Sequence, residues 1–346
     1  MKLILAIFWN TSERRLRLAW RLVGTLLVAL TVTSVLTVLG LFPALLTVAD
    51  LILDAGSSVD ALRQMPDAFS LTALLSQPQF LMAQAVTLLV ATVATLWLSA
   101  RLVDRRRFAS FGLHFGRAWW ADLAFGLILG ALLMSLIWVA ELALGWVRIV
   151  GTLHTPRPGQ AFARAIVIPL ISFVCIGIYE ELAIRGYLLR NLAEGLNLPF
   201  LKPTGGTFLA WVISSVIFGL LHFQNPNATM ISSVYLMLGG LLFGLGYILT
   251  GELALPIGLH ISWNFFLGAV FGFPVSGIAP GPSFVAVEQL GPDLWTGGAF
   301  GPEAGLLGVF ATLLGGVLVL AWTRRRTPRA TPWCSMLAYE RPLARG

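Results

Sequence analysis

The sequence predicts an all-α, polytopic integral membrane protein with about eight transmembrane helices. Of its 346 residues, 57% are hydrophobic and only 11% are charged, and the mean hydropathy is +0.84. A soluble core cannot absorb that much apolar surface. A helix crosses the ~30 Å hydrocarbon layer in about 20 residues. Apolar runs near that length fall at residues 22–46, 80–100, 122–147, 165–189, 206–223, 229–249, 253–272 and 304–322.

The basic residues are divided unevenly between the two sides of these helices. The N-terminus, residues 101–117, residues 185–202 and the tail from Arg324 together hold 19 of the 23 Lys and Arg. The other side holds Arg63, Arg148, Arg157 and Arg164. Because positively charged connections stay in the cytoplasm, we expect both termini to be cytoplasmic. The net charge of +7 is therefore interpreted as topology in a lipid bilayer, and not as a sign of a nucleic-acid partner.

These patterns divide the chain into five parts. We expect an N-terminal interfacial segment at 1–21, three transmembrane helices within 22–150, a transmembrane core at 165–273, an irregular extracytoplasmic loop at 274–303, and a last helix with a basic cytoplasmic tail at 304–346. Cys175 lies inside a span and Cys334 in the tail, so no disulfide is expected.

An unusual charged stretch, Ile178 to Gly186, interrupts the fourth apolar run. Each ionisable group at that depth costs about 2.5–3.5 kcal/mol on insertion scales, so such groups are normally paired or functional. Glu181 and Arg185 are four residues apart and can form an ion pair on one helix face. Glu180 points about 100° away and has no basic residue four positions on. Glu181 is therefore interpreted as structural, and Glu180 remains available for chemistry or for a packing network.

Two histidines lie in the apolar helices that follow. His222 has Phe218 one turn before it, and His260 has Asn264 one turn after it. Either histidine alone is more typical of a satisfied hydrogen bond between helices. Together with Glu180, however, they provide a general base, its partner and hydrogen-bond donors, which is what the addition of water to a carbonyl requires.

Other candidates carry less weight. His114 and His154 lie in connections without suitable neighbours, and Glu141 is a buried-carboxylate candidate without a partner, to which we assign a structural or interfacial role. The sequence contains neither a His-Glu-x-x-His zinc motif nor a Gly-x-Ser-x-Gly elbow.

Three spaced motifs on successive helices resemble those of a known family. Glu180-Glu181-x-x-x-Arg185, Phe218-x-x-x-His222 and His260-x-x-x-Asn264 are similar to the motifs of the CAAX prenyl protease and bacteriocin-processing (CPBP, or Abi) family of intramembrane endopeptidases. The similarity covers about 100 residues, from Ile166 to Phe273. The flanking residues look like those of bacterial members, which implies the bacterial cytoplasmic membrane.

The resemblance implies proteolysis of a membrane-associated or lipid-linked polypeptide, in a polar cavity formed by the fourth to seventh helices. Carried onto this chain, it has Glu180 and His222 polarise water, while His260 and Asn264 donate hydrogen bonds to the tetrahedral intermediate. Glu181 and Arg185 then orient the site, with Phe218 in a supporting position. No cofactor is expected. A zinc-dependent version, with both histidines and a glutamate as ligands, is the less favoured alternative, because asparagine is a poor zinc ligand and a good oxyanion donor.

Two other classes of function remain open at the level of sequence. A scaffold or binding protein could keep the fold and its cavity without hydrolysis, and a transporter could use the same residues as a proton relay. One geometric difficulty also remains. At about 1.5 Å per residue, His260, Glu180 and His222 lie at depths of roughly 10, 15 and 24 Å from the cytoplasmic ends of their helices. We therefore expect tilted helices or a recessed loop at 204–206 to bring them level.

Overall fold

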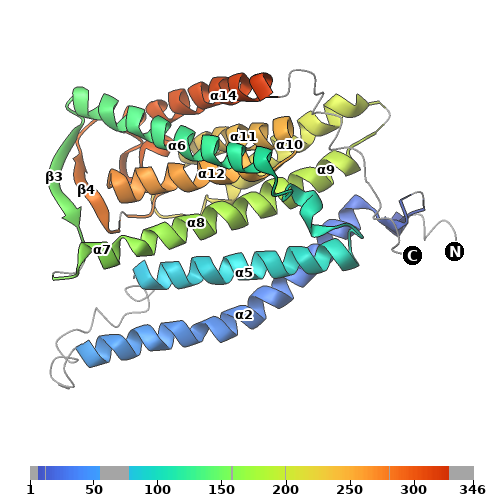
Figure 1. Cartoon of the computed structure of the whole chain (residues 1–346), viewed down its shortest axis with the longest axis horizontal. Coiled ribbons are helices and arrows are strands. Elements are labelled where there is room, and N and C mark those ends of the chain that lie inside the picture. Colours follow the sequence, from blue (N-terminus) through green and yellow to red (C-terminus); the bar gives the residue numbers. More distant parts are fainter. Residues whose placement is uncertain are drawn as a thin grey trace.

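The computed structural model of the chain describes residues 7–11, 13–54, 78–156, 159–198, 200–279 and 281–326. The long helices run side by side along the long axis of the molecule (Figure 1). In chain order, the α-helices are α2 (Leu18–Asp54), α5 (Pro78–Leu102), α6 (Arg117–Ala143), α7 (Phe162–Ala165), α8 (Val167–Glu181), α9 (Arg190–Gly195), α10 (Lys202–Leu221), α11 (Met230–Thr250), α12 (Ala254–Asn264), α13 (Asp293–Thr296) and α14 (Leu306–Arg326). Shorter or wider turns form η1 (Phe108–Phe111), η2 (Leu182–Leu189), η3 (Phe265–Val270), η4 (Gly298–Phe300) and η5 (Pro302–Ala304).

The helical membrane fold predicted from composition is confirmed. Within the described residues, seven helices are long and apolar enough to cross a membrane. The seventh predicted span, 253–272, corresponds to a shorter apolar helix, Ala254–Val270. Its first part, α12, packs against α6, α8 and α11 and is buried along nearly its whole length. A helix enclosed by protein in this way does not need the length of a lipid-facing span.

The connection predicted as an irregular loop at 274–303 contains regular structure, so that prediction was wrong in this respect. Strand β4 (Ser283–Gln289) pairs antiparallel with β3 (Val147–His154), which follows α6. The two strands lie at the left end of Figure 1. Their pairing satisfies backbone hydrogen-bonding groups that an irregular loop would leave to water. The segment Ser-Phe-Val-Ala-Val-Glu-Gln has the β-branched and aromatic content of a strand.

A small hairpin lies at the opposite end of the molecule. Strand β1 (Trp9–Asn10) pairs with β2 (Arg15–Leu16), where an interfacial segment was expected at 1–21. The part of that segment up to Ala6, and the tail beyond Arg326, lie outside the described residues.

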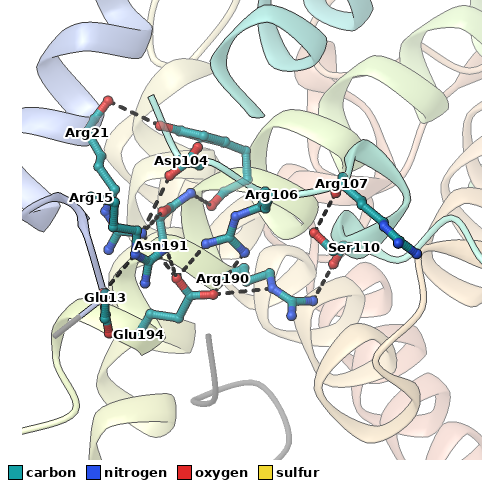
Figure 2. A network of polar contacts seen from close by, with 11 residues as sticks. Glu13, Arg15, Arg21, Asp104, Arg106, Arg107, Ser110, Arg190, Asn191 and Glu194 are labelled. Atoms are coloured by element: carbon teal, nitrogen blue, oxygen red, sulfur yellow. Dashed lines mark hydrogen bonds and ion pairs between the residues drawn. The ribbon is translucent and has the colours of Figure 1, made fainter. Parts of the chain in front are cut away.

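A buried ionic network joins four separate segments at this end (Figure 2). Glu194 on α9 accepts two hydrogen bonds from Arg106, at 2.9 and 2.6 Å, and forms ion pairs with Arg15 at 2.9 Å and Arg21 at 3.1 Å. Burial alone would lower the pKa of Arg106, but the carboxylate of Glu194 outweighs it and raises that pKa. The α5–α6 connection is therefore held firmly against α9. We call Arg15, Arg21, Arg106 and Glu194 the arginine network.

Glycine residues on α6 and α8 let these helices approach α12 closely. A Cβ atom added to Gly126 on α6 would lie 2.4 Å from the carbonyl oxygen of Leu255 on α12. One added to Gly177 on α8 would lie 2.6 Å from the side chain of Ile261. Since real Cβ atoms do not approach other atoms so closely, only glycine permits these contacts. The first contact holds α12, which carries His260, against α6, and the second holds it against α8, which carries Glu180 and Glu181.

Candidate active site

The two adjacent glutamates occupy the last residues of α8, where the helix changes its winding. Glu180 and Glu181 are followed at once by the π-helical segment η2. In the same way, Asn264 is the last residue of α12 and is followed by the π-helical segment η3. Such wide turns are rare in proteins overall, and those that occur frequently lie at functional sites. Both are found in this chain beside residues that the sequence marked as candidates.

Glu181 connects the predicted ion pair to a histidine. Its Oε1 atom lies 2.8 Å from Nη1 of Arg185, as the i,i+4 spacing predicts, and also 2.8 Å from Nδ1 of His260. Arg185 donates a further hydrogen bond of 3.0 Å to the carbonyl oxygen of Gly240 on α11. Glu181, Arg185 and His260 are all nearly fully buried. Because a carboxylate accepts from Nδ1, the Nε2 atom of His260 is left to face the opposite direction.

Aromatic rings fix the orientation of the buried cation and of the imidazole. The Arg185 guanidinium lies 4.5 Å from the ring centre of Phe218 and 5.3 Å from that of Phe243. Phe243 stacks on the His260 ring at 4.8 Å, with the planes only 14° apart. These contacts lock the ring of His260 in one orientation, which a precise site requires.

Glu180 has a different environment from its neighbour. Its Oε1 atom accepts a long hydrogen bond of 3.4 Å from the Tyr179 hydroxyl. Its Oε2 atom is buried, has no hydrogen-bond partner, and lies 3.8 Å from Nε2 of His260. That distance is too long for a direct hydrogen bond and is compatible with a water molecule that contacts both atoms. Glu180 is therefore a carboxylate with an unused oxygen beside an imidazole.

His222 lies where α10 ends. Its Nδ1 atom is 2.8 Å from the carbonyl oxygen of Phe218, one turn earlier. A carbonyl oxygen only accepts, so Nδ1 carries the proton, and the Nε2 atom of the neutral ring has a lone pair available. The ring also packs against Phe218, with centroids 4.8 Å apart, and Phe218 in turn contacts His260 edge-on at 6.1 Å. Phe218 is thus a shared wall between the two imidazoles.

A single cavity of about 920 Å³ brings these groups together. Glu180, His222, His260 and Asn264 all line it, although they come from three helices. Ideal straight helices would place His260, Glu180 and His222 at different depths, but in the structure all three line the same cavity. Residues 204–206, where a recessed loop was considered, are helical, so such a loop is not the explanation.

Several neighbours were not foreseen from the sequence. Tyr179 and Phe243 contact the site directly, but isolated aromatic residues in an apolar helix give no signal of it. Glu303 accepts a hydrogen bond of 2.9 Å from the indole of Trp263 and another of 2.6 Å from the backbone of Ser276. It thereby holds one wall of the cavity, since all three residues line it.

Two of the residues set aside as lacking partners have one. His114 contacts Glu252 through Nδ1 at 2.8 Å, and Glu141 accepts a hydrogen bond of 3.2 Å from Gln289 on β4. Both partners are far away in sequence, so spacing could not reveal them. His154 lies exposed in β3 and is not among the residues that line the cavity.

The zinc alternative would need three ligands grouped around one point. Within the described ranges, no three His, Cys, Asp or Glu side chains are grouped as a metal ion would need. The carboxamide of Asn264 suits a hydrogen-bond donor better than a zinc ligand.

Comparison with known proteins identifies one family. Residues 162–266 match the family model described as type II CAAX prenyl endopeptidase Rce1-like. The match begins with α7 and ends just after Asn264, so it contains all four cavity-lining candidates. Neither the curated proteins nor the solved structures gave a match.

Proposed function

We propose that this chain hydrolyses a peptide bond of a membrane-associated or lipid-linked polypeptide. Residues 162–266 form an Rce1-like type II CAAX prenyl endopeptidase domain, and this family indicates a CAAX-type intramembrane endopeptidase. The seven apolar helices agree with an integral membrane protein. The observation that carries the proposal is the buried, unpartnered Oε2 atom of Glu180, which lies in a cavity shared with two imidazoles and a carboxamide.

In the proposed reaction, Glu180 is the general base. A water molecule donates one proton toward Oε2 of Glu180 and the other toward Nε2 of His222. As the water oxygen attacks the carbonyl carbon, Glu180 takes its proton. The C–N bond then breaks, and Glu180 returns the proton to the leaving nitrogen, which gives a carboxylic acid and an amine. No step needs a metal ion.

His260 and Asn264 are proposed to stabilise the oxyanion. The Asn264 carboxamide can donate from its nitrogen, and His260 can donate from Nε2 when its ring carries two protons. The carboxylates of Glu181 and Glu180 lie 2.8 and 3.8 Å from the two ring nitrogens of His260. Donors arranged in advance around a developing negative charge are typically the largest single contribution to such catalysis.

The test is turnover of a fluorogenic membrane peptide by purified protein in liposomes. We expect Glu180→Gln to lower kcat by about 10²–10⁴-fold, the usual contribution of a positioned general base. Glu141→Gln is the matched control, since that carboxylate is also buried but lies outside the cavity lining. Undiminished turnover in the Glu180 variant would refute the proposal. Loss of wild-type turnover with a zinc chelator, and its return on adding zinc, would support the alternative.

A scaffold function is the second candidate, favoured by the size of the cavity relative to the few groups that the reaction uses. It predicts that a partner membrane protein remains bound to the Glu180→Gln variant and that the wild-type protein leaves the partner intact.

A further inference from the structure

The cavity that contains Glu180 extends toward one end of the molecule only. Its lining includes residues from Pro78 to Thr92 on α5 and from Ile168 to Glu180 on α8. After α8, the lining continues along η2 only as far as Ile184. On α10 it touches the last turn alone, from Phe218 onward. These are the parts of the three helices nearest β3 and β4, at the left of Figure 1.

The mouth of the cavity lies at that same end. The lining residues that are exposed are Gln84, Pro156, Leu221, Ile278 and Ala279. Gln84 is in the second turn of α5, Leu221 is the last residue of α10, and the others belong to connections next to β3 and β4. A peptide could therefore reach Glu180 from this side.

The other end is closed beneath the site. The buried side chains of Leu182, Tyr187, Tyr247, Leu253 and Ile257 form an apolar cluster there. The α5–α6 connection covers this cluster, since the Tyr247 hydroxyl donates to the carbonyl oxygen of Phe111. The arginine network then holds the connection to α9 (Figure 2). Entry from this end would require several buried contacts to break.

The distribution of charge assigns the two ends to the two sides of the membrane. At the closed end, the described residues include Arg14, Arg15, Arg17, Arg21, Arg101, Arg105, Arg106, Arg107, Arg117, Arg190, Arg324, Arg325 and Arg326. At the open end they include two, Arg148 and Arg164, and Arg148 is paired with Glu288. The positive-inside rule places the closed end in the cytoplasm.

Resting on the function proposed above, we propose that the site is entered from the extracytoplasmic side and takes an extended, apolar segment of a membrane-anchored polypeptide. This excludes a prenylated tail that is presented from the cytoplasm. Between the mouth and Glu180, the walls are largely apolar, with Leu81 and Leu88 from α5 facing the same space as Ile168, Phe173 and Ile176 from α8. Such walls favour apolar side chains on a segment that leaves the outer leaflet.

The first experiment measures sidedness without relying on activity. In the full chain with Cys175→Ala and Cys334→Ala, we introduce Ala279→Cys at the mouth, or Asn197→Cys in the exposed α9–α10 connection at the closed end. Intact cells are treated with a membrane-impermeant maleimide. We expect Ala279→Cys to react before lysis and Asn197→Cys to react only after it. The reverse pattern would overturn the proposal, whatever the chemistry of the site.

A second pair of variants tests whether the cavity itself opens outward. Tyr235→Cys lies in the lining, whereas the adjacent Val234→Cys is exposed on the outer face of α11 and is expected to contact lipid. A small impermeant thiol reagent added outside should modify Tyr235→Cys faster by at least tenfold. Equal protection of both positions would show that the cavity is closed on this side.

The substrate class is tested with two reporters that carry the same apolar cleavable segment beside a membrane anchor, one oriented outward and one inward. We expect wild-type protein to cleave the outward reporter alone, and Glu180→Gln to cleave neither. Cleavage of the inward reporter alone would reject outward entry but keep the proposed hydrolysis. If the cysteine labelling follows the expected pattern but neither reporter is cleaved, this substrate class is rejected and the orientation of the protein is retained.

Discussion

At the scale of single residues, Glu181 has two partners that matter for different reasons. Its ion pair with Arg185 neutralises a buried cation, and its contact with His260 orients an imidazole whose Nε2 atom faces the cavity. The first contact is predictable from the spacing of four residues. The second joins positions 79 apart, and no local pattern contains it.

A double substitution separates these two contributions. Glu181→Gln leaves Arg185 buried without its carboxylate, and breaking a buried pair in this way costs about 3–5 kcal/mol. In Glu181→Gln/Arg185→Met neither charge remains, so we expect most of the thermal stability to return. The kcat value should stay low, with KM nearly unchanged, because Nδ1 of His260 still lacks its carboxylate partner. Recovery of kcat together with stability would show that Glu181 is structural only.

At the scale of helices, the close contact between α6 and α12 positions His260 and Asn264. The sequence shows Gly126 and Gly130 at a spacing that permits close approach, without showing which helix approaches. In the structure the partner is α12, and a Cβ atom on Gly130 would lie 2.2 Å from the Ser262 hydroxyl. The π-helical turns after Glu181 and Asn264 could not be predicted either, because they follow from tertiary packing and not from residue preference.

We expect Gly126→Ala to destabilise the protein. The added methyl group must displace the backbone of α12, and overpacking of this kind costs about 1–3 kcal/mol. Gly316→Ala on α14 is the matched control, because its nearest neighbour would be 4.0 Å from the new Cβ atom. Thermal unfolding in detergent compares the two variants. A midpoint for Gly126→Ala equal to that of the control would contradict the inferred packing.

At the scale of the whole molecule, the arginine network ties the hairpin, α2 and the α5–α6 connection to α9 (Figure 2). From the sequence, these arginines could be interpreted only as topology determinants. That they converge on one glutamate depends on the arrangement of four segments in space. The fold class and the three motifs were predictable because periodic apolar runs and fixed spacings are local. The strands β3 and β4 were not, because they lie 129 positions apart at their nearest paired residues.

Glu194→Gln should therefore destabilise the closed end strongly. It leaves several buried arginines without their shared carboxylate, so a loss of about 3–5 kcal/mol in the free energy of unfolding is expected. Glu288→Gln, which breaks the exposed pair with Arg148, should cost about 1 kcal/mol or less. Chemical denaturation of both variants in the same micelles compares them. Similar losses would contradict a special role for the network.

The most direct test of the account compares the N-termini of membrane proteins in cells that make either the wild-type chain or its Glu180→Gln variant at equal levels. If Glu180 is the base that activates water, wild-type membranes will contain new internal N-termini that are missing from the variant membranes. Identical sets of N-termini in the two membranes would contradict the assignment of this cavity as a proteolytic site.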